Sequence, residues 1–202
     1  MAAPRSKPRF TIDQYLASER ASEERHLYLD GEIYAMAGEN DAHGIITVNI
    51  VGTLHFQLKG TRCQARSKDT KVRTGPIPLP GHSTSGLFSY PDVFVICGEP
   101  EFHDAFKDVV LNPTAIIEVL SPSTEAFDRG EKWTRYQTHN STLREYVLVS
   151  QDKPQVEVFT RQANGDWSYH LETGLAVAVH LASIGCTLKL ADVYDRVDFS
   201  AK

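Results

Sequence analysis

Hydrophobic and polar positions follow several distinct patterns along the chain, and each pattern predicts an element. Thr11 and Gln14 have capping-box spacing, which predicts that a helix begins there. Asp30-Gly31 stands between two short apolar and aromatic runs, a pattern typical of a hairpin with a two-residue turn. Apolar residues recur every three or four positions from Asp41 to Lys59, which predicts an amphipathic helix. Its expected inner face consists of Ile45, Val48, Val51, Leu54 and Leu58.

Two runs in the middle of the chain, Pro91 to Cys97 and Thr114 to Leu120, are almost continuously apolar and β-branched. Such runs are typical of central strands that are covered on both faces. Asp128 and Glu131 then have capping-box spacing, which predicts a helix, and the strand-like residues 144–150 follow it. The order strand, helix, strand predicts a crossover unit, and the shorter alternating runs beyond it predict antiparallel strands.

Composition places the chain among globular proteins, because 41% of its residues are hydrophobic and 23% are charged. No apolar run is long enough to span a bilayer, and no apolar segment follows the basic N-terminus as it does in a secretory signal. We therefore expect a flexible basic tail over residues 1–9, a single domain over residues 10–202 and a cytoplasmic location. The three cysteines are odd in number and suit neither a disulfide framework nor a zinc site, so buried thiols are expected.

Asp92 and Glu118 stand out because each belongs to a strand that should be buried. An isolated buried carboxylate needs a cation, a basic partner or a raised pKa. If the two strands are neighbours, one hard divalent cation such as Mg²⁺ would serve both carboxylates. The structural alternatives stay open: Pro-Asp is a common turn feature, and a core-facing Arg or Lys could neutralise Glu118. His43, near the start of a helix, is interpreted as an ordinary hydrogen-bonded histidine.

Basic residues are concentrated in one stretch, although the formal net charge of −5 gives no overall attraction to nucleic acid. The stretch predicts either a stripe that contacts phosphates or a solvated strand face that protects a sheet edge. Its five members are Arg62, Arg66, Lys68, Lys71 and Arg73. No aromatic-rich run indicates a platform on which single-stranded bases would stack.

The order Pro91-Asp92, Glu118-Val119-Leu120 and then Lys132 resembles the PD-(D/E)XK nuclease superfamily. Within it, the chain resembles the bacterial Uma-type family, a domain of unknown function classed among restriction endonucleases. The stretches that carry the resemblance are LDGEIYAMAGENDAHG, SYPDVFVICG, PTAIIEVLSPSTEAFDRGEKWTRYQ, LREYVLVS and SIGCTLKLADVY. Together they extend over nearly the whole chain, from Phe10 to Val197.

The resemblance implies an α/β (α+β) fold: a restriction endonuclease-like mixed β-sheet flanked by helices, with additional antiparallel strands at the C-terminal end. It implies an endonuclease that uses Mg²⁺ or Mn²⁺ to hydrolyse DNA phosphodiester bonds, with DNA as a partner and a homodimer as the assembly. Asp92, Glu118 and the backbone carbonyl of Val119 would bind the metal. Lys132 would stabilise the charge that develops on the phosphate or orient the attacking water.

Two positions depart from the family pattern. Leu120 stands where the simplest pattern has a lysine, so the amine is expected to come from Lys132 on the following helix. Leu27 stands where the family commonly has a glutamate, and Glu32 is an alternative acid nearby. The second departure keeps another function open, namely a catalytically impaired module that binds nucleic acid or a protein partner. A third alternative is a metal-dependent hydrolase that acts on a smaller phosphate ester.

Overall fold

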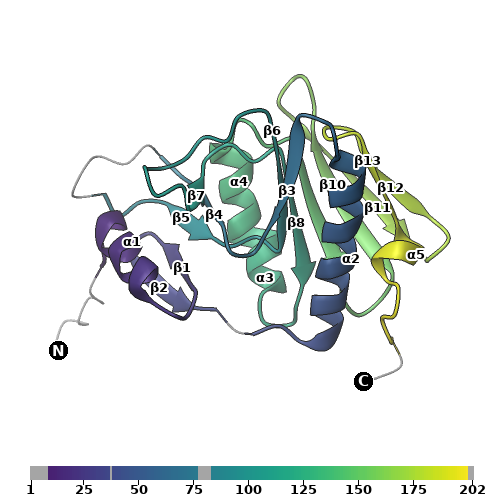
Figure 1. Cartoon of the computed structure of the whole chain (residues 1–202), viewed down its shortest axis with the longest axis horizontal. Coiled ribbons are helices and arrows are strands. Elements are labelled where there is room, and N and C mark those ends of the chain that lie inside the picture. Colours follow the sequence, from purple (N-terminus) through teal and green to yellow (C-terminus); the bar gives the residue numbers. More distant parts are fainter. Residues whose placement is uncertain (1–8, 37, 77–82, 200–202) are drawn as a thin grey trace, which may run out of the picture.

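A computed structural model describes residues 9–36, 38–76 and 83–199. The predicted basic tail therefore lies outside the described residues, apart from Arg9. Two larger sheets and a short ribbon make up the fold, and helices cover both faces of the largest sheet (Figure 1). This arrangement is the predicted mixed α/β (α+β) fold. Within the described ranges, no helix combines the length and the apolar character needed to cross a membrane.

The largest sheet contains six strands in the described part of the chain, in the order β11-β10-β9-β8-β6-β3. Its strands are β3 (Cys63–Ser67), β6 (Val93–Cys97), β8 (Ala115–Leu120), β9 (Glu145–Ser150), β10 (Gln155–Arg161) and β11 (Trp167–Thr173). β8 and β9 run parallel, and the other neighbouring pairs are antiparallel. β6 and β8 lie inside the sheet and are buried along almost their whole length, which confirms the two predicted central strands.

The second sheet has the strand order β2-β1-β5-β4-β7 among the described residues. Its strands are β1 (His26–Leu29), β2 (Glu32–Ala35), β4 (Lys71–Thr74), β5 (Leu87–Ser89) and β7 (Val109–Val110). Helix α1 (Ile12–Ala21) packs against this sheet and begins with the predicted capping box of Thr11 and Gln14. The predicted hairpin is also confirmed: Asp30 and Gly31 have φ values of 46° and 93°, and a type I′ turn requires a positive φ at both positions.

Helix α2 (Asp41–Leu58) covers one face of the six-stranded sheet, and its extent agrees with the prediction. The predicted inner face is confirmed at Leu54 and Leu58 but is wrong at Val48, which is 70% exposed. The helix is apolar on more than one side, so its sequence fits two faces equally well, and packing against the sheet decides between them. The apolar residues that it buries are Ile46, Ile50, Leu54 and Leu58.

The opposite face of this sheet is covered by the predicted crossover between β8 and β9. It consists of α3 (Glu125–Phe127), the π-helical turn η1 (Asp128–Lys132) and α4 (Trp133–His139). The predicted capping box is wrong, since Asp128 caps no helix and lies buried inside η1. Its carboxylate instead contacts Lys132. The reason is that the helical run begins earlier, at Glu125, so Asp128 lies within the run and not at its start.

The C-terminal part of the chain adds the predicted antiparallel strands. β10 and β11 form a hairpin at one edge of the large sheet. β12 (Ala178–Leu181) and β13 (Cys186–Lys189) form a separate ribbon, and α5 (Leu190–Val193) follows it. Leu181, Leu188 and Leu190 of this segment join the core beneath α2.

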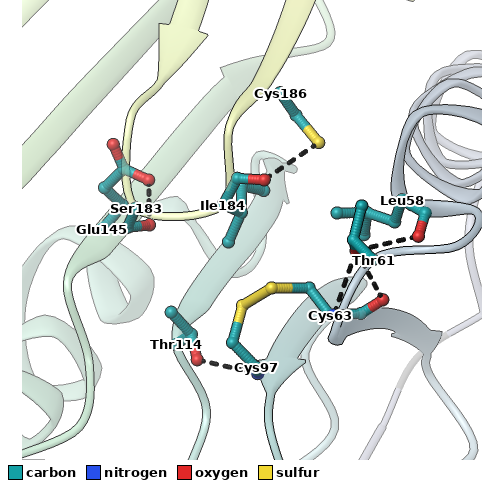
Figure 2. Close-up of a disulfide and its surroundings, with 9 residues drawn as sticks. All are labelled: Leu58, Thr61, Cys63, Cys97, Thr114, Glu145, Ser183, Ile184 and Cys186. Carbon is teal, nitrogen blue, oxygen red and sulfur yellow. Dashed lines mark hydrogen bonds between the residues drawn. A yellow bond between two sulfur atoms is a disulfide. The ribbon is translucent and has the colours of Figure 1, made fainter.

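The prediction of three buried thiols is wrong, because Cys63 and Cys97 form a disulfide between β3 and β6 (Figure 2). The two residues are direct partners in the antiparallel register, with Cα atoms 4.0 Å apart. Spacing along the chain could not reveal this pairing, because it depends on which strands become neighbours. Cys186 is a buried free cysteine, as predicted. Disulfides persist mainly in oxidising compartments, so the bond gives no support to the cytoplasmic location, which stays a prediction.

Candidate active site

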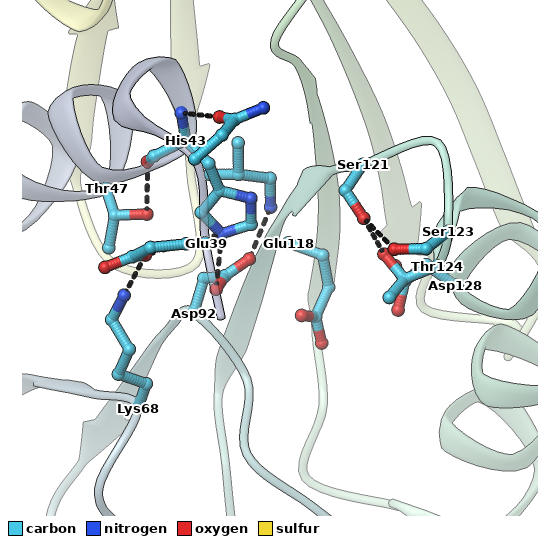
Figure 3. Close-up of polar contacts among 12 residues, drawn as sticks. Glu39, His43, Thr47, Lys68, Asp92, Glu118, Ser121, Ser123, Thr124 and Asp128 are labelled. Atoms are coloured by element: carbon cyan, nitrogen blue, oxygen red, sulfur yellow. Dashed lines mark hydrogen bonds and ion pairs between the residues drawn. The ribbon is translucent and has the colours of Figure 1, made fainter. Parts of the chain in front are cut away.

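Asp92 and Glu118 lie opposite each other on the two central strands. The register pairs Val93 with Ile117, and one further step places Asp92, immediately before β6, opposite Glu118 of β8. Directly opposed residues of an antiparallel pair have Cβ atoms about 5 Å apart. The two residues that the sequence singled out therefore lie side by side in the sheet, with the Asp92 carboxylate directed to His43 and the Glu118 carboxylate turned away from it (Figure 3).

Each oxygen of Asp92 accepts one hydrogen bond from the protein. His43 Nε2 lies 2.9 Å from Asp92 Oδ1, and the N–H of Val119 donates to Oδ2 at 2.8 Å. His43 stands in the first turn of α2, where Asn40 caps the helix by accepting from the His43 N–H. Burial raises the pKa of Asp92, but the hydrogen bond and charge of His43 and the Val119 N–H outweigh it, so the pKa is lowered. Asp92 therefore stays ionised and keeps lone pairs for a further ligand.

Glu118 has a different environment, because it is only 3% exposed. Lys132 Nζ lies 2.8 Å from Glu118 Oε1, yet the approach lacks hydrogen-bond geometry, and this buried oxygen has no hydrogen-bond partner. Burial is the main cause that raises the pKa of Glu118, to about 8; Asp128 and Asp92 add to the rise, and Lys132 opposes it. A second cation beside Glu118 would stabilise its ionised form.

Lys132 reaches this point from η1 on the face opposite α2. Its ammonium group lies between Glu118 Oε1, at 2.8 Å, and Asp128 Oδ1, at 2.9 Å, and all three side chains are buried. Burial lowers the pKa of Lys132, but the charges of Asp128 and Glu118 outweigh it, so the pKa lies well above its ordinary value. One ammonium thus contacts two carboxylates, Glu118 and Asp128, and its charge also lowers the pKa of Asp92, so the acids of the cluster outnumber the ammonium.

These donors suit a magnesium ion held mainly by oxygen. Mg²⁺ is usually bound by one or two carboxylates and keeps several of its waters. The excess of acid around the single ammonium supports such a site. Val119 directs its N–H to Asp92, and its carbonyl faces the same neighbouring strand. In the ranges that the structure describes, no group of three or more His, Cys, Asp or Glu side chains is placed to hold a metal, so water would complete the shell.

The five basic residues do not form one stripe, which corrects the expected arrangement. Lys71 and Arg73 belong to β4 of the second sheet and are buried, and Lys71 pairs with Asp108 at 3.1 Å. The chain turns from one sheet into the other between β3 and β4, so alternation along the sequence does not produce one exposed face. The other three members lie outside β4. Arg62 is exposed, and Lys68 pairs with Glu39. The guanidinium of Arg66 lies 5.8 Å from the centroid of the Phe102 ring.

Sequence reasoning missed two residues of the cluster. His43 was interpreted as an ordinary histidine, and no local pattern indicates that the start of α2 meets Asp92. Asp128 was assigned to a helix cap, although its i,i+4 spacing to Lys132 was a usable signal for an ion pair. Leu27 lies on β1 opposite Tyr34 and offers no metal ligand. Glu32 lies on β2, in the second sheet, and accepts a hydrogen bond from Tyr34.

The chain is similar to known proteins in sequence and in fold. The family model Uma2, described as "Putative restriction endonuclease", matches residues 12–187. The uncharacterized protein slr1290 of Synechocystis is 31% identical over 192 residues, which cover 95% of each chain. A second uncharacterized Synechocystis protein, sll1609, is 31% identical over 157 residues, which cover 78% of this chain and 84% of that protein.

A solved structure shares the fold. It is the crystal structure of "a putative nuclease belonging to DUF820" from Anabaena variabilis, with a TM-score of 0.70 and 18% sequence identity. The alignment covers 92% of this chain and 97% of that chain. The likeness therefore extends over almost the whole of both chains.

Proposed function

Because the chain belongs to the Uma2 family, whose description is that of restriction endonucleases, we propose that it is an endonuclease that hydrolyses DNA phosphodiester bonds with Mg²⁺ or Mn²⁺. The observation that carries the proposal is the buried cluster at the centre of the sheet. There Asp92 lies opposite Glu118, and the ammonium of Lys132 lies 2.8 Å from Glu118. Such a constellation combines a cation site with a fixed positive charge, which are the two components that phosphodiester hydrolysis needs.

Asp92 and Glu118, with the carbonyl of Val119, would hold the ion. Such an ion would supply Lewis-acid chemistry there, since it would polarise a phosphoryl oxygen and lower the pKa of a coordinated water. His43 and the Val119 N–H hold the Asp92 carboxylate in one orientation. Lys132 presents its ammonium to the negative charge that develops on the phosphate.

The proposed substrate requires a surface for the DNA backbone. Arg62 and Arg66 belong to the region of β3, the edge strand next to β6. Arg66 lies near the end of β3 that pairs with Val93, beside Asp92, whereas Arg62 precedes the other end, where Cys63 pairs with Cys97. We assign them, together with Lys68, to contacts with phosphates; the burial of Lys71 and Arg73 argues against such contacts for these two. A double-strand cut needs two such centres, so the proposal includes a homodimer.

Cleavage of plasmid and linear DNA with Mg²⁺ or Mn²⁺ tests the proposal. We expect metal-dependent cleavage by the wild type, loss of cleavage in Asp92→Ala and Glu118→Ala, and unchanged cleavage in Asp152→Ala, which replaces an exposed acid outside the cluster. Two results would overturn the enzymatic proposal. One is equal cleavage by the wild type and both cluster variants, and the other is a wild type that cleaves none of several DNA substrates.

The second candidate function is the catalytically impaired module that binds nucleic acid or a protein partner. Leu27 favours it, because the family commonly has a glutamate at this position and a leucine side chain cannot bind a metal ion. If the chain is such a module, it should bind DNA in a salt-dependent way, and this binding should persist without metal and in the Glu118→Ala variant. Cleavage that depends on Glu118 would exclude it. A smaller phosphate ester as substrate would instead be indicated by Glu118-dependent hydrolysis of such an ester without DNA cleavage.

A further inference from the structure

Aromatic side chains form a continuous strip from the interior of the large sheet to its edge. Tyr146, Phe159 and Tyr169 are direct partners across β9, β10 and β11. Their ring centroids lie 6.4 Å apart for Tyr146 and Phe159 and 5.2 Å apart for Phe159 and Tyr169. Trp133 of α4 stacks on Tyr146 at 5.0 Å and meets Trp167 edge-on at 4.7 Å. We call these five residues the aromatic strip.

Exposure increases along the strip toward β11. Tyr146 is fully buried, whereas Tyr169 is 54% exposed, and Leu171, on the same face of β11, is 42% exposed. The Tyr169 hydroxyl donates to Glu157 Oε2 at 3.2 Å, and Arg129 in turn binds Glu157 with two hydrogen bonds of 2.6 and 2.7 Å. The exposed ring is therefore held in place and offers a flat surface to solvent.

A cation lies beside the strip without a carboxylate partner. The guanidinium of Arg161 lies 5.0 Å from the Trp167 ring centroid. One of its nitrogens donates to the Gln137 carbonyl at 2.6 Å, whereas its buried Nε has no hydrogen-bond partner. Across the described ranges, no Asp or Glu forms an ion pair with Arg161. The charge of this residue is thus free to attract a phosphate.

The strip is continuous with the candidate active site. Lys132 and Trp133 are neighbours in sequence, where η1 passes into α4. The register also connects Glu118 to Leu148, Leu148 to Glu157 and Glu157 to Leu171 across successive strands. Leu171 is consequently three strand spacings, about 14 Å, from Glu118 in the same row of the sheet. Leu148 and Glu157, which lie between them, are buried, so the strip and the cluster share a row of the sheet without an open path along it.

We infer that the exposed end of the aromatic strip, Tyr169 with Leu171, binds unpaired nucleobases by stacking, while Arg161 attracts the adjoining phosphates. The inference rests on the proposed function only in taking nucleic acid as the ligand. Stacking on aromatic rings is tolerant of sequence, and unpaired bases expose the faces that stacking needs, so single strands bind better than duplexes. The absence of an aromatic-rich run hid this surface from sequence reasoning, because three strands and a helix contribute its members.

Intrinsic fluorescence gives a direct test, because the two tryptophans of the chain, Trp133 and Trp167, both belong to the strip. We expect a single-stranded oligonucleotide, titrated in the presence of EDTA, to quench this fluorescence, and a duplex of the same length to do so more weakly. Tyr169→Ser should weaken binding about tenfold or more, whereas Tyr169→Phe should retain it. Leu175→Ser is the matched control, since Leu175 is similarly exposed but lies outside the strip.

The outcomes separate this inference from the proposed function. Binding by the wild type that Tyr169→Ser abolishes, in a protein that cleaves no DNA, would sustain the stacking surface and remove the nuclease. Glu118-dependent cleavage combined with equal oligonucleotide binding by the wild type and Tyr169→Ser would overturn the stacking surface alone. A third outcome would also overturn the stacking surface: light scattering shows concentration-dependent dimerisation that Tyr169→Ser abolishes, and oligonucleotide does not quench the fluorescence. This outcome would assign the edge strand β11 to self-association.

Discussion

Lys132 and Glu118 form an ion pair of 2.8 Å between side chains that are only 7% and 4% exposed. Burying two charges costs so much desolvation free energy that such pairs add little net stability compared with apolar residues of similar volume. The presence of Asp128 on the other side of Lys132 and of Asp92 opposite Glu118 increases this cost, because acids outnumber the ammonium. The cluster therefore adds little net stability to the fold, which agrees with the proposed metal site.

Removal of the ammonium should destabilise the protein when no divalent ion is present. Lys132→Met leaves Glu118 and Asp128 buried without compensation, so we expect the free energy of unfolding to fall by about 3–5 kcal/mol. Mg²⁺ should restore part of this loss, because an ion that binds only the folded state stabilises it. Urea denaturation with and without Mg²⁺ measures both effects, with exposed Lys153→Met as control. Unchanged stability of Lys132→Met would contradict this account of the pair.

His43 should act through Asp92 as a positioning residue. His43→Ala removes the partner of Asp92 Oδ1, and loss of such an orienting contact typically weakens metal binding about 10- to 100-fold. His43→Gln, which keeps a hydrogen-bond donor, should recover part of the affinity. Calorimetric titration with Mn²⁺ measures the change, and His55→Ala on the exposed side of α2 is the control. Wild-type affinity in His43→Ala would assign His43 no role at the cluster.

Acid unfolding should reveal a second charged cluster, away from the candidate site. Burial alone would raise the pKa of Asp108, but hydrogen bonds from Arg20 and Lys71 outweigh it and lower the pKa to about 2. A carboxyl whose pKa is lower in the folded state stabilises the fold above its unfolded pKa, near 4, and loses that contribution as the pH falls toward 2. The stability difference between the wild type and Asp108→Asn should thus be largest above pH 4 and shrink below it. Chemical denaturation from pH 6 to pH 2 measures this difference, and a constant difference would refute the assignment.

The disulfide should contribute measurably to stability. It joins residues 34 positions apart, and closing a loop of this length in the unfolded chain is expected to contribute about 4 kcal/mol. Reduction should accordingly lower the melting temperature of the wild type but not that of a Cys63→Ser, Cys97→Ser double variant. Thiol titration of the unfolded protein should count one free cysteine before reduction and three afterwards. Three thiols in freshly purified, unreduced protein would show that the bond does not form.

Local patterns were sufficient for most of the elements. The Asp30-Gly31 turn, the Thr11 capping box and the apolar runs before Cys97 and Leu120 each determine their own conformation through nearby residues, so the sequence predicted them correctly. The inner face of α2 and the partner of Cys63 depend on which elements become neighbours, and neither could be predicted from spacing.

The same distinction between local sequence patterns and contacts of distant segments applies to the candidate site. Asp92 and Glu118 could be singled out because a carboxylate in an apolar run is costly wherever it lies, and that cost is visible in the sequence. His43 and the aromatic strip were missed because they depend on contacts between distant segments. The burial of Lys71 and Arg73 was missed for a related reason, since alternation does not reveal that the chain changes sheets.

Calorimetric binding of Mg²⁺ or Mn²⁺ to the wild type and to Glu118→Gln tests the central claim most directly, because it asks whether the opposed carboxylates form a metal site without requiring any substrate. We predict saturable binding to the wild type and a loss of at least tenfold in affinity for Glu118→Gln, while the variant keeps its fold. Equal affinity in both proteins, or no binding to either, would contradict a metal centre at Asp92 and Glu118.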